Sequence, residues 1–433
     1  MMKHFFAEKF CGFYEKIFKE KISTGVGIFV KNLFFVAIGS GFATVFAFIF
    51  QILAGRFLGP AEYGKYALVQ SIAMFFYIPM TLGINTALVK YNAEKEDRQR
   101  QRKIIAAIFS IVLVLSSVSA AAILFLTPGL AKLFSVSVQV IDLALVFCLF
   151  YVPYVILTGS LQSLQQMKRY SFFQACYGFL ALAFLSLFFF NKEVNFEAAV
   201  LSVCFSFFAV SALIIFSIRD YLSFSVDAYW VKKIMRYGLY SAVGGVAAIF
   251  YMNIDKILIN KYISIAQTGI YRVYYGAFIT LALSVFSIFN TVFFPVASRN
   301  SNKNNLFKKI NKVAPYLLVF GLPFLMISGF IVIKLYGRQY PFDFSLAALF
   351  SVAAILICLD GMYCWLMNSV GVAGAKVTAA GAAILALVNV SFNFLLIPRI
   401  GFEGAVISII LGYSASIAVV LSQRKVYRTK INE

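Results

Sequence analysis

Two carboxylates interrupt long apolar segments of this 433-residue chain, and they are its clearest candidates for chemistry. Asp360 lies deep within an apolar run, and Asp255 lies near the end of another, with Lys256 beside it. An ionisable group in hydrocarbon is costly, so it is retained either for a function or because a partner compensates its charge. We interpret Asp360 either as a site that gains and loses a proton or as a carboxylate that ties helices together by hydrogen bonds. For Asp255 we favour an ion pair with Arg272 or Lys261.

Five cations also lie close to apolar segments and could meet an anionic ligand. Lysine and arginine near the ends of membrane helices usually extend to the lipid headgroups, which is the alternative interpretation for each of them. Arg272 differs because Tyr274 and Tyr275 follow it within the same apolar segment. The five are Lys31, Arg56, Lys90, Lys261 and Arg272.

Other kinds of chemistry find little support in the sequence. A single histidine, His4, cannot build a histidine-based metal site or a histidine proton relay. The six cysteines show no paired spacing and mostly fall inside apolar runs, where cysteine behaves as a small hydrophobic residue. No nucleotide-binding pattern appears, so we expect no metal and no bound cofactor.

The elements that carry these residues are membrane helices. The chain is 62% hydrophobic and 13% charged, whereas soluble domains are about 45–50% apolar and about 25% charged. Apolar stretches long enough to cross a hydrocarbon core of about 30 Å recur from Leu33–Gly55 to Gly404–Leu421. The sequence therefore predicts an all-α polytopic membrane protein with about twelve transmembrane helices.

The net charge of +21 has a topological explanation, so we expect no nucleic-acid partner. In a twelve-span arrangement, 28 of the 38 lysines and arginines fall on the side that holds both termini, and 10 fall on the other. Positive residues are retained on the cytoplasmic side of a membrane. Both termini are therefore predicted to be cytoplasmic.

The two halves of the chain resemble each other at a constant offset of 205 residues. Ala61, Gly64 and Tyr66 match Ala266, Gly269 and Tyr271, and Asn85-Thr86 matches Asn290-Thr291. An even number of spans separates the pairs, so the sequence predicts two six-helix lobes related by a pseudo-two-fold axis along the membrane normal. Asn85 and Asn290 then either face each other across a cavity or hydrogen-bond between packed helices, the latter worth about 1 kcal/mol.

We divide the chain into three parts on this basis. Residues 1–30 form a basic amphipathic segment, which is either a helix lying on an anionic leaflet or a solvated tail. Residues 31–220 form the N-lobe with spans one to six. Residues 221–433 form the C-lobe with spans seven to twelve and a cytoplasmic tail.

The stretch from Leu53 to Leu68, LAGRFLGPAEYGKYAL, resembles the signature of the polysaccharide biosynthesis flippases of the Wzx type, in the multidrug/oligosaccharidyl-lipid/polysaccharide exporter superfamily. Gly59-Pro60 would end the first helix because proline lacks an N–H donor and restricts the residue before it. We interpret this motif as a tight turn and expect it to bind nothing. Further stretches that fit the family are Leu82–Tyr91, Asp255–Ile259, Gly269–Tyr271, Phe293–Ala297 and Ile400–Ala405.

The resemblance implies a function. It implies a bacterial cytoplasmic-membrane flippase that moves undecaprenyl-pyrophosphate-linked oligosaccharide units outwards by alternating access, for O-antigen or another surface polysaccharide. It also implies a proton or sodium ion as a coupling ion, and a polysaccharide polymerase and chain-length machinery as partners. For such a cargo the five cations would meet the pyrophosphate, with Tyr274 and Tyr275 beside the sugars, and Asp360 or Asp255 would couple transport to the ion.

Two other functions compete with this one. A drug or cation antiporter of the same superfamily would need an acidic, aromatic cavity, whereas this chain has few intramembrane acids. A membrane-embedded polymerase or glycosyltransferase would need a sizeable external loop or a soluble catalytic region, and the connections here are short. We therefore expect a transporter and not an enzyme.

Overall fold

The computed structural model describes residues 24–94, 96–223, 225–287 and 303–423. Throughout these ranges the chain is helical and contains no strand. Most of the predicted N-terminal segment, His4, Cys11 and Asn290 lie outside the described residues. The elements in chain order are α2 (Thr24–Thr81), α3 (Ile84–Ala93), α4 (Arg98–Phe134), α5 (Val138–Ser163), α6 (Met167–Phe190), α7 (Phe196–Ser217), the 3₁₀ turn η1 (Arg219–Tyr221), α8 (Ala228–Tyr262), α9 (Ile265–Tyr274), the π-helical η2 (Tyr275–Thr280), α11 (Lys303–Tyr336), α12 (Phe344–Asn368), α13 (Val372–Ile400) and α14 (Phe402–Ser422).

Ten helices in the described part of the chain are long and apolar enough to cross a membrane. An eleventh is added if the two segments of α8, Ala228–Ala242 and Gly244–Tyr262, form one bent span. The helix α2 is in addition divided at Gly59, whose φ of 74° and ψ of 171° are not helical. The polytopic helical fold is thus confirmed, and twelve as the number of spans stays a prediction.

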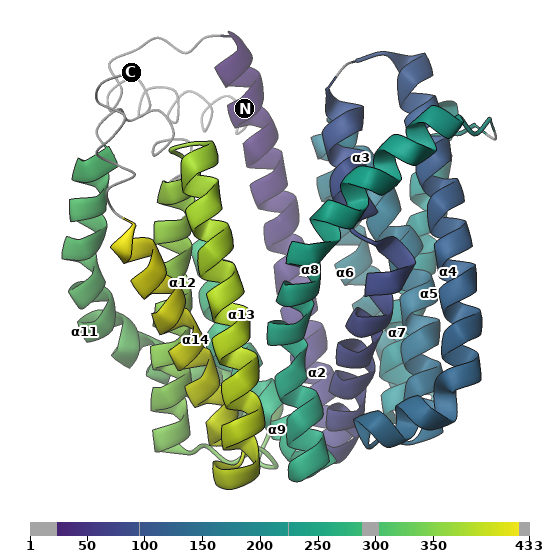
Figure 1. Ribbon diagram of the computed structural model, residues 1–433. Helices are drawn as coiled ribbons and strands as arrows, with labels where there is room; N and C mark the ends of the chain where they lie inside the picture. Colours follow the sequence, from purple (N-terminus) through teal and green to yellow (C-terminus); the bar gives the residue numbers. More distant parts are fainter. Residues whose placement is uncertain (1–23, 95, 224, 288–302, 424–433) are drawn as a thin grey trace, which may run out of the picture.

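The break at Gly59 turns the chain back on itself, as the sequence predicted for Gly59-Pro60. In Figure 1 the first arm of α2, residues 24–58, descends from the top of the view, and the second arm, residues 60–81, climbs again from the bottom. Glycine tolerates this positive φ, and Pro60 suits the first turn of the second arm because an N–H there would have no helical partner. We call the end at which α2 begins the upper end and the end that contains Gly59 the lower end.

The helices pack into two groups. The helices α5, α6 and α7 pack on α2 and on one another, whereas α12 packs on α11, α13 and α14. In Figure 1 the first group lies on the right and the second on the left, with the first arm of α2 and the lower part of α8 between them. Helix α8 contacts both groups, because it packs against α3 and α4 as well as α13.

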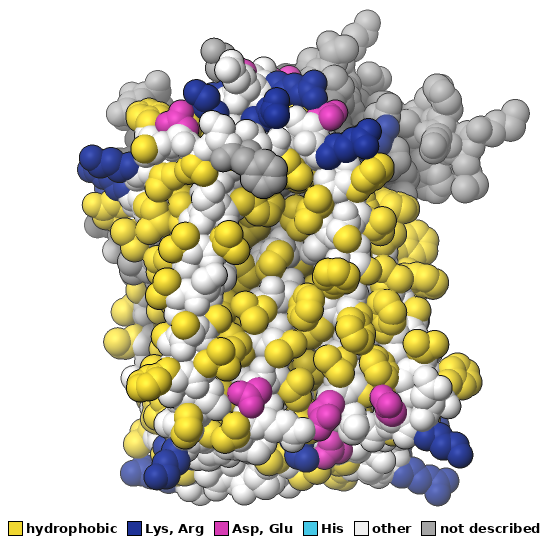
Figure 2. Space-filling view, turned by 90° about the vertical axis from the view of Figure 1, so that its right-hand side faces the viewer, with side chains coloured by type: hydrophobic (Ala, Val, Ile, Leu, Met, Phe, Trp, Pro, Cys, Tyr) yellow, Lys and Arg dark blue, Asp and Glu magenta, His cyan; other side chains and the backbone are white. Residues whose placement is uncertain are grey.

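The surface has the charge distribution of a membrane protein. In Figure 2 a broad hydrophobic band covers the side of the molecule, and the charged side chains gather above and below it. The most exposed aromatic side chains of the helices include Phe125, Phe190 and Phe216, which are 86%, 87% and 69% exposed. Such rings would be unfavourable in water and suit a surface that contacts lipid.

At the lower end the two halves of the chain touch through their equivalent glycines. A Cβ atom on Gly64 would lie 2.1 Å from the carbonyl oxygen of Ile265, and one on Gly269 would lie 2.0 Å from that of Pro60. Gly64 and Pro60 are the repeat equivalents of Gly269 and Ile265 at the offset of 205, so the contact is reciprocal. Reciprocal contacts of this kind are what a two-fold axis produces. They support the predicted symmetry, although the lobe boundaries remain a prediction.

This contact corrects our interpretation of the Leu53–Leu68 motif. The motif does make a tight turn, but Gly64 also allows the second arm of α2 to approach α9 closely. A larger residue at either glycine would separate the two backbones.

Candidate functional site

Arg272 lies where α9 faces the second arm of α2, and it is the cation best placed between the two halves. Its Nη2 donates a hydrogen bond to Oε1 of Gln70 at 3.4 Å, and Gln70 donates in turn to the hydroxyl of Tyr66 at 2.9 Å. Tyr63, Tyr66, Tyr275 and Tyr336 are the electrostatic neighbours of the guanidinium. Among the described residues, Arg272 has no carboxylate within 4.0 Å. A half-buried guanidinium without an acidic partner keeps its full charge for an anionic ligand.

Asp255 does not pair with Arg272 or Lys261 as the sequence suggested. Its Oδ1 lies 2.9 Å from Nζ of the neighbouring Lys256, and its Oδ2 accepts a hydrogen bond from the hydroxyl of Tyr271 at 2.6 Å. The side chains of this pair are 2% and 4% exposed, so Lys256 neutralises the carboxylate inside the protein. The sequence prediction was wrong because it took the partner to be more distant than the adjacent lysine. This geometry favours a structural role for Asp255.

The two tyrosines after Arg272 point to different places. Tyr274 is fully buried, and its hydroxyl donates to the carbonyl of Pro341 at 2.9 Å and accepts from the N–H of Asp343 at 2.7 Å. It therefore anchors the lower-end loop and, in this structure, does not line a surface between the halves. Tyr275 is partly exposed, and its ring lies 4.9 Å from Nζ of Lys256. Only Tyr275 remains beside Arg272 as a candidate for sugar contact.

Arg56 and Lys261 lie at the lower end, beside the turn at Gly59 and in the last turn of α8. Arg56 is exposed and its Nη1 approaches the carbonyl of Leu335 at 3.5 Å, and Lys261 is exposed beside the ring of Tyr262. These positions suit headgroup contacts. Lys31 belongs to α2, but its side chain lies outside the described residues.

Asn85 packs inside the first helix group. Its Oδ1 lies against Gly159 of α5, where an added Cβ would approach within 2.2 Å, and this oxygen has no hydrogen-bond partner. The position favours helix packing over a cavity surface. Its repeat equivalent Asn290 lies outside the described residues, so the predicted pairing across a cavity stays a prediction.

Asp360 lines a cavity of about 200 Å³ within the second helix group. Its Oδ1 accepts a hydrogen bond from the hydroxyl of Ser416 at 2.7 Å, and the residue is 8% exposed. Tyr251 and Tyr413 line the same cavity, together with Thr378. Since Asp360 lies eight residues before the upper end of α12, it is about 12 Å from that end along the helix axis. This acid has no basic partner within 4.0 Å among the described residues, and it borders an open space that an ion could enter.

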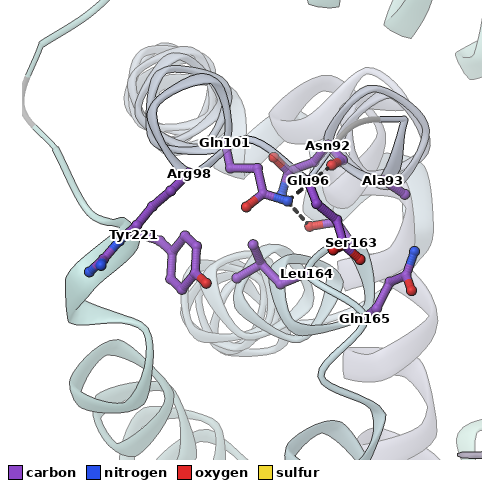
Figure 3. Close-up of a pocket in the computed structure, with 9 residues that line it drawn as sticks. All are labelled: Asn92, Ala93, Glu96, Arg98, Gln101, Ser163, Leu164, Gln165 and Tyr221. Carbon is purple, nitrogen blue, oxygen red and sulfur yellow. Dashed lines mark hydrogen bonds between the residues drawn. The ribbon is translucent and has the colours of Figure 1, made fainter.

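A second cavity, of about 270 Å³, opens at the upper end and was not predicted (Figure 3). Asn92 is fully buried beside it, and its Nδ2 donates to the hydroxyl of Ser163 at 2.7 Å. Since that hydroxyl donates to the carbonyl of Ser160, it must accept from Asn92, and Oδ1 of Asn92 is left without a protein partner. The other polar residues that line this cavity are Glu96, Arg98, Gln101, Gln165 and Tyr221. The sequence analysis missed this cavity because single polar residues at the end of a span, such as Asn92 and Gln101, form no distinctive sequence pattern.

Lys90 lies at the upper end on the opposite side of α3, among aromatic rings. Its Nζ is 4.2 Å from the ring centroid of Tyr237 and 5.4 Å from that of Tyr91. Lys233, which the sequence analysis did not single out, lies over Tyr91 as well, at 5.0 Å. This arrangement joins α3 of the first half to the start of α8.

Comparison with known proteins identifies a family for this chain. The pattern of the family described as "Polysaccharide biosynthesis protein" matches residues 29–301. An uncharacterized membrane protein of Methanocaldococcus jannaschii, MJ1068, is 24% identical over 193 residues, a match that covers 42% of this chain and only 37% of that protein.

Solved structures show the same fold at low identity. An inward-facing multidrug resistance MATE transporter of the MOP superfamily matches with a TM-score of 0.68 and 15% identity, over 90% of this chain and 96% of that one. An outward-facing form of such a transporter matches with a TM-score of 0.59 and 15% identity, over 96% and 100%. The lipid II flippase MurJ in an inward closed conformation matches with a TM-score of 0.65 and 16% identity, over 90% and 87%.

The family match covers more than half of the chain and includes the Leu53–Leu68 motif. The motif and the match lead to one assignment: the chain belongs to the polysaccharide biosynthesis protein family.

Proposed function

We propose that this protein is a flippase that moves an undecaprenyl-pyrophosphate-linked oligosaccharide from the cytoplasmic to the outer leaflet of a bacterial membrane. The observation that carries the proposal is Arg272, a guanidinium between the two halves whose described neighbours are an amide and tyrosines instead of a carboxylate. Such a group can bind a diphosphate, and the partly exposed ring of Tyr275 beside it suits a sugar. The family match and the fold shared with the lipid II flippase MurJ support the same cargo class.

Alternating access requires that one end close while the other opens. In this structure the lower end is held together by the contact of Gly64 with Gly269. With the upper end in the cytoplasm, as the lysine and arginine distribution indicates, a state closed at the lower end would be the inward-facing one. The higher TM-score to the inward-facing MATE transporter, 0.68 against 0.59 for the outward-facing one, supports this assignment.

Asp360 is the proposed site for the coupling ion, a proton or sodium. Binding of an ion shifts an equilibrium between two conformations only if the ion binds one of them more tightly. Asp360 meets this requirement if movement of α12 against α14 changes its contact with Ser416. A polymerase and chain-length machinery are proposed to receive the cargo afterwards.

Replacing Arg272 tests the proposal. Arg272→Ala should reduce transport of a lipid-linked oligosaccharide into the far leaflet of proteoliposomes by about tenfold or more, since a hydrogen bond to a charged group contributes about 1.5–3 kcal/mol. Arg272→Lys should retain part of the activity. Arg338→Ala, at an exposed arginine of the lower end, is the matched control for loss of a positive charge.

The proposal also makes a prediction for cells. Deleting the gene should cause the lipid-linked oligosaccharide to accumulate in the cytoplasmic leaflet, and the Arg272→Ala protein should not relieve this accumulation although it reaches the membrane. Transport at the wild-type rate by Arg272→Ala would remove the basis for the assignment.

A second candidate is export of a cationic drug, and the Asp360 cavity is the feature that favours it. A carboxylate beside Tyr251 and Tyr413 is a suitable environment for an organic cation. The same proteoliposomes distinguish the two functions: an exporter would move an organic cation in a manner that depends on Asp360 and is unaffected by Arg272→Ala.

A further inference from the structure

Two lysines at the upper end share one aromatic ring. Nζ of Lys90 lies 5.4 Å and Nζ of Lys233 lies 5.0 Å from the ring centroid of Tyr91, so the two nitrogens are at most about 10 Å apart. Tyr237 contacts Lys90 from a second side, and Trp230 contacts Lys233 at 5.0 Å. The rings themselves pack together, since Tyr91 lies 5.5 Å from Tyr237 and 6.2 Å from Trp230. The lysines are therefore held by a connected aromatic framework.

The charge of these lysines is not neutralised by the protein around them. Within the described part of the chain, neither lysine has a carboxylate within 4.0 Å. Arg100 shows the contrast, because it also lies over Trp230 but pairs with Glu94 at 2.7 Å. A ring face attracts a cation through its quadrupole and leaves the net charge unchanged. Two like charges at this spacing repel each other, and an anion between them would relieve the repulsion.

The two lysines come from different halves of the chain. Lys90 belongs to α3, which follows the second arm of α2, and Lys233 belongs to the first segment of α8, Ala228–Ala242. In Figure 1 this segment of α8 crosses the upper end beside α3. Gly83 and Gly238 permit a close crossing there, because a Cβ on Gly83 would lie 2.8 Å from the carbonyl oxygen of Gly238 and one on Gly238 would lie 2.9 Å from that of Leu82. A ligand that contacts both lysines would thus connect the two halves at the end opposite to Gly64 and Gly269.

We propose that Lys90 and Lys233, with Tyr91 and Tyr237, form the site that first receives the diphosphate of the lipid-linked cargo. This inference rests on the proposed function, which places the upper end in the cytoplasm where such a cargo is made. A diphosphate carries the charge to interact with both ammonium groups at once. The adjacent rings offer apolar faces to a sugar or to the first part of the lipid chain. Anionic phospholipids carry the same phosphate chemistry, so the test must separate them from the cargo.

The test measures binding of farnesyl diphosphate, a short prenyl diphosphate, to the purified full-length protein in detergent. Lys90→Gln and Lys233→Gln should each raise the Kd about tenfold, the loss expected for one charge-assisted contact. Lys232→Gln is the matched control, because it removes the same charge from an exposed position one residue away, and it should leave the Kd within about twofold. Farnesol and phosphatidylglycerol are measured in parallel.

Each outcome decides the proposal. The site is supported if replacing either lysine lowers the affinity for farnesyl diphosphate while the affinity for phosphatidylglycerol stays constant. An unchanged Kd in the double variant overturns it, and so does an equal loss of phosphatidylglycerol binding, which would make the site a general lipid contact. The proposed function is judged separately by flux in proteoliposomes. If the wild-type protein binds the diphosphate through these lysines but moves no cargo, the proposed function is refuted, and the binding site for a diphosphate still stands.

Discussion

The contact between Gly64 and Gly269 makes the lower end sensitive to a single methyl group. Gly64→Ala would bring a Cβ atom to 2.1 Å from the carbonyl oxygen of Ile265, and Gly269→Ala would bring one to 2.0 Å from that of Pro60. The shortest comfortable separation between carbon and a carbonyl oxygen is about 3.3 Å. Both neighbours are backbone atoms, so no side-chain rotation relieves the overlap. The two helices must therefore separate by about 1 Å or more.

The free-energy cost falls on the conformation closed at the lower end. Overpacking of a tight contact usually costs about 1–3 kcal/mol, which corresponds to an approximately 5- to 150-fold shift in an equilibrium between two conformations. We expect either alanine to shift the protein towards a state open at the lower end and to slow transport. The double variant should add little to either single change, since helices that have already separated accommodate the second methyl group.

Distances between spin labels would measure this shift. Lys192, in the α6–α7 connection, and Arg338, in the α11–α12 connection, are exposed at the lower end in different halves. In a background without native cysteines, labels at these sites should show a longer distance population in Gly64→Ala than in the wild-type protein. Gly129→Ala is the control, because nothing lies within 4 Å of the added methyl group. An unchanged distance distribution in a folded, monodisperse Gly64→Ala protein would show that the contact does not govern closure.

Three further predictions concern acids and their partners. Asp360→Asn keeps the shape of the side chain but removes titration, so it should abolish flux driven by an imposed pH gradient in proteoliposomes while binding of the cargo persists; undiminished flux would eliminate Asp360 as the coupling site. Hydrogen bonds from the Leu346 N–H and the Ser345 hydroxyl hold the pKa of Asp343 below its usual value of about 3.9. This cap of α12 therefore stabilises the fold at neutral pH. The stabilisation is lost as the pH falls through the lowered pKa. Asp343→Ala should cost about 1 kcal/mol in thermal unfolding at pH 7, and the wild-type protein should lose stability relative to Asp343→Asn on acidification. Lys256→Met would leave a buried carboxylate unpaired and should cost about 3–5 kcal/mol, much of which a second change to neutralise its partner should restore.

Much of the fold was predictable because hydropathy and glycine-proline chemistry act locally. The helical membrane architecture follows from the length of the apolar runs, and the reversal at Gly59 follows from the backbone preferences of glycine and proline. The sequence also showed that Gly64 and Gly269 are equivalent. It did not show that they touch, because periodicity describes one helix at a time and says nothing about contacts between distant helices.

The candidate site was harder to predict because it depends on which way each side chain points. Tyr274 and Tyr275 are neighbours in the sequence, yet one is buried under a loop and the other is partly exposed beside Arg272. Continuation of α9 as the π-helical segment Tyr275–Thr280 adds to this difficulty, since an ordinary helical wheel does not apply across it. Lys233 was missed because one lysine among several in the basic start of α8 becomes distinctive only when it is seen over Tyr91.

The contact at Gly64 and Gly269 has a consequence for how such a chain could have arisen. Each half supplies the same two elements, a glycine and the carbonyl oxygen four residues before it, at Pro60 and at Ile265. Nothing in this contact requires that the halves be different or covalently joined. A chain of half the length, with one such glycine, already contains everything needed to form it with a second copy of itself. Closure of the lower end is therefore a property that a homodimeric ancestor could possess before duplication and fusion joined its two copies into one chain.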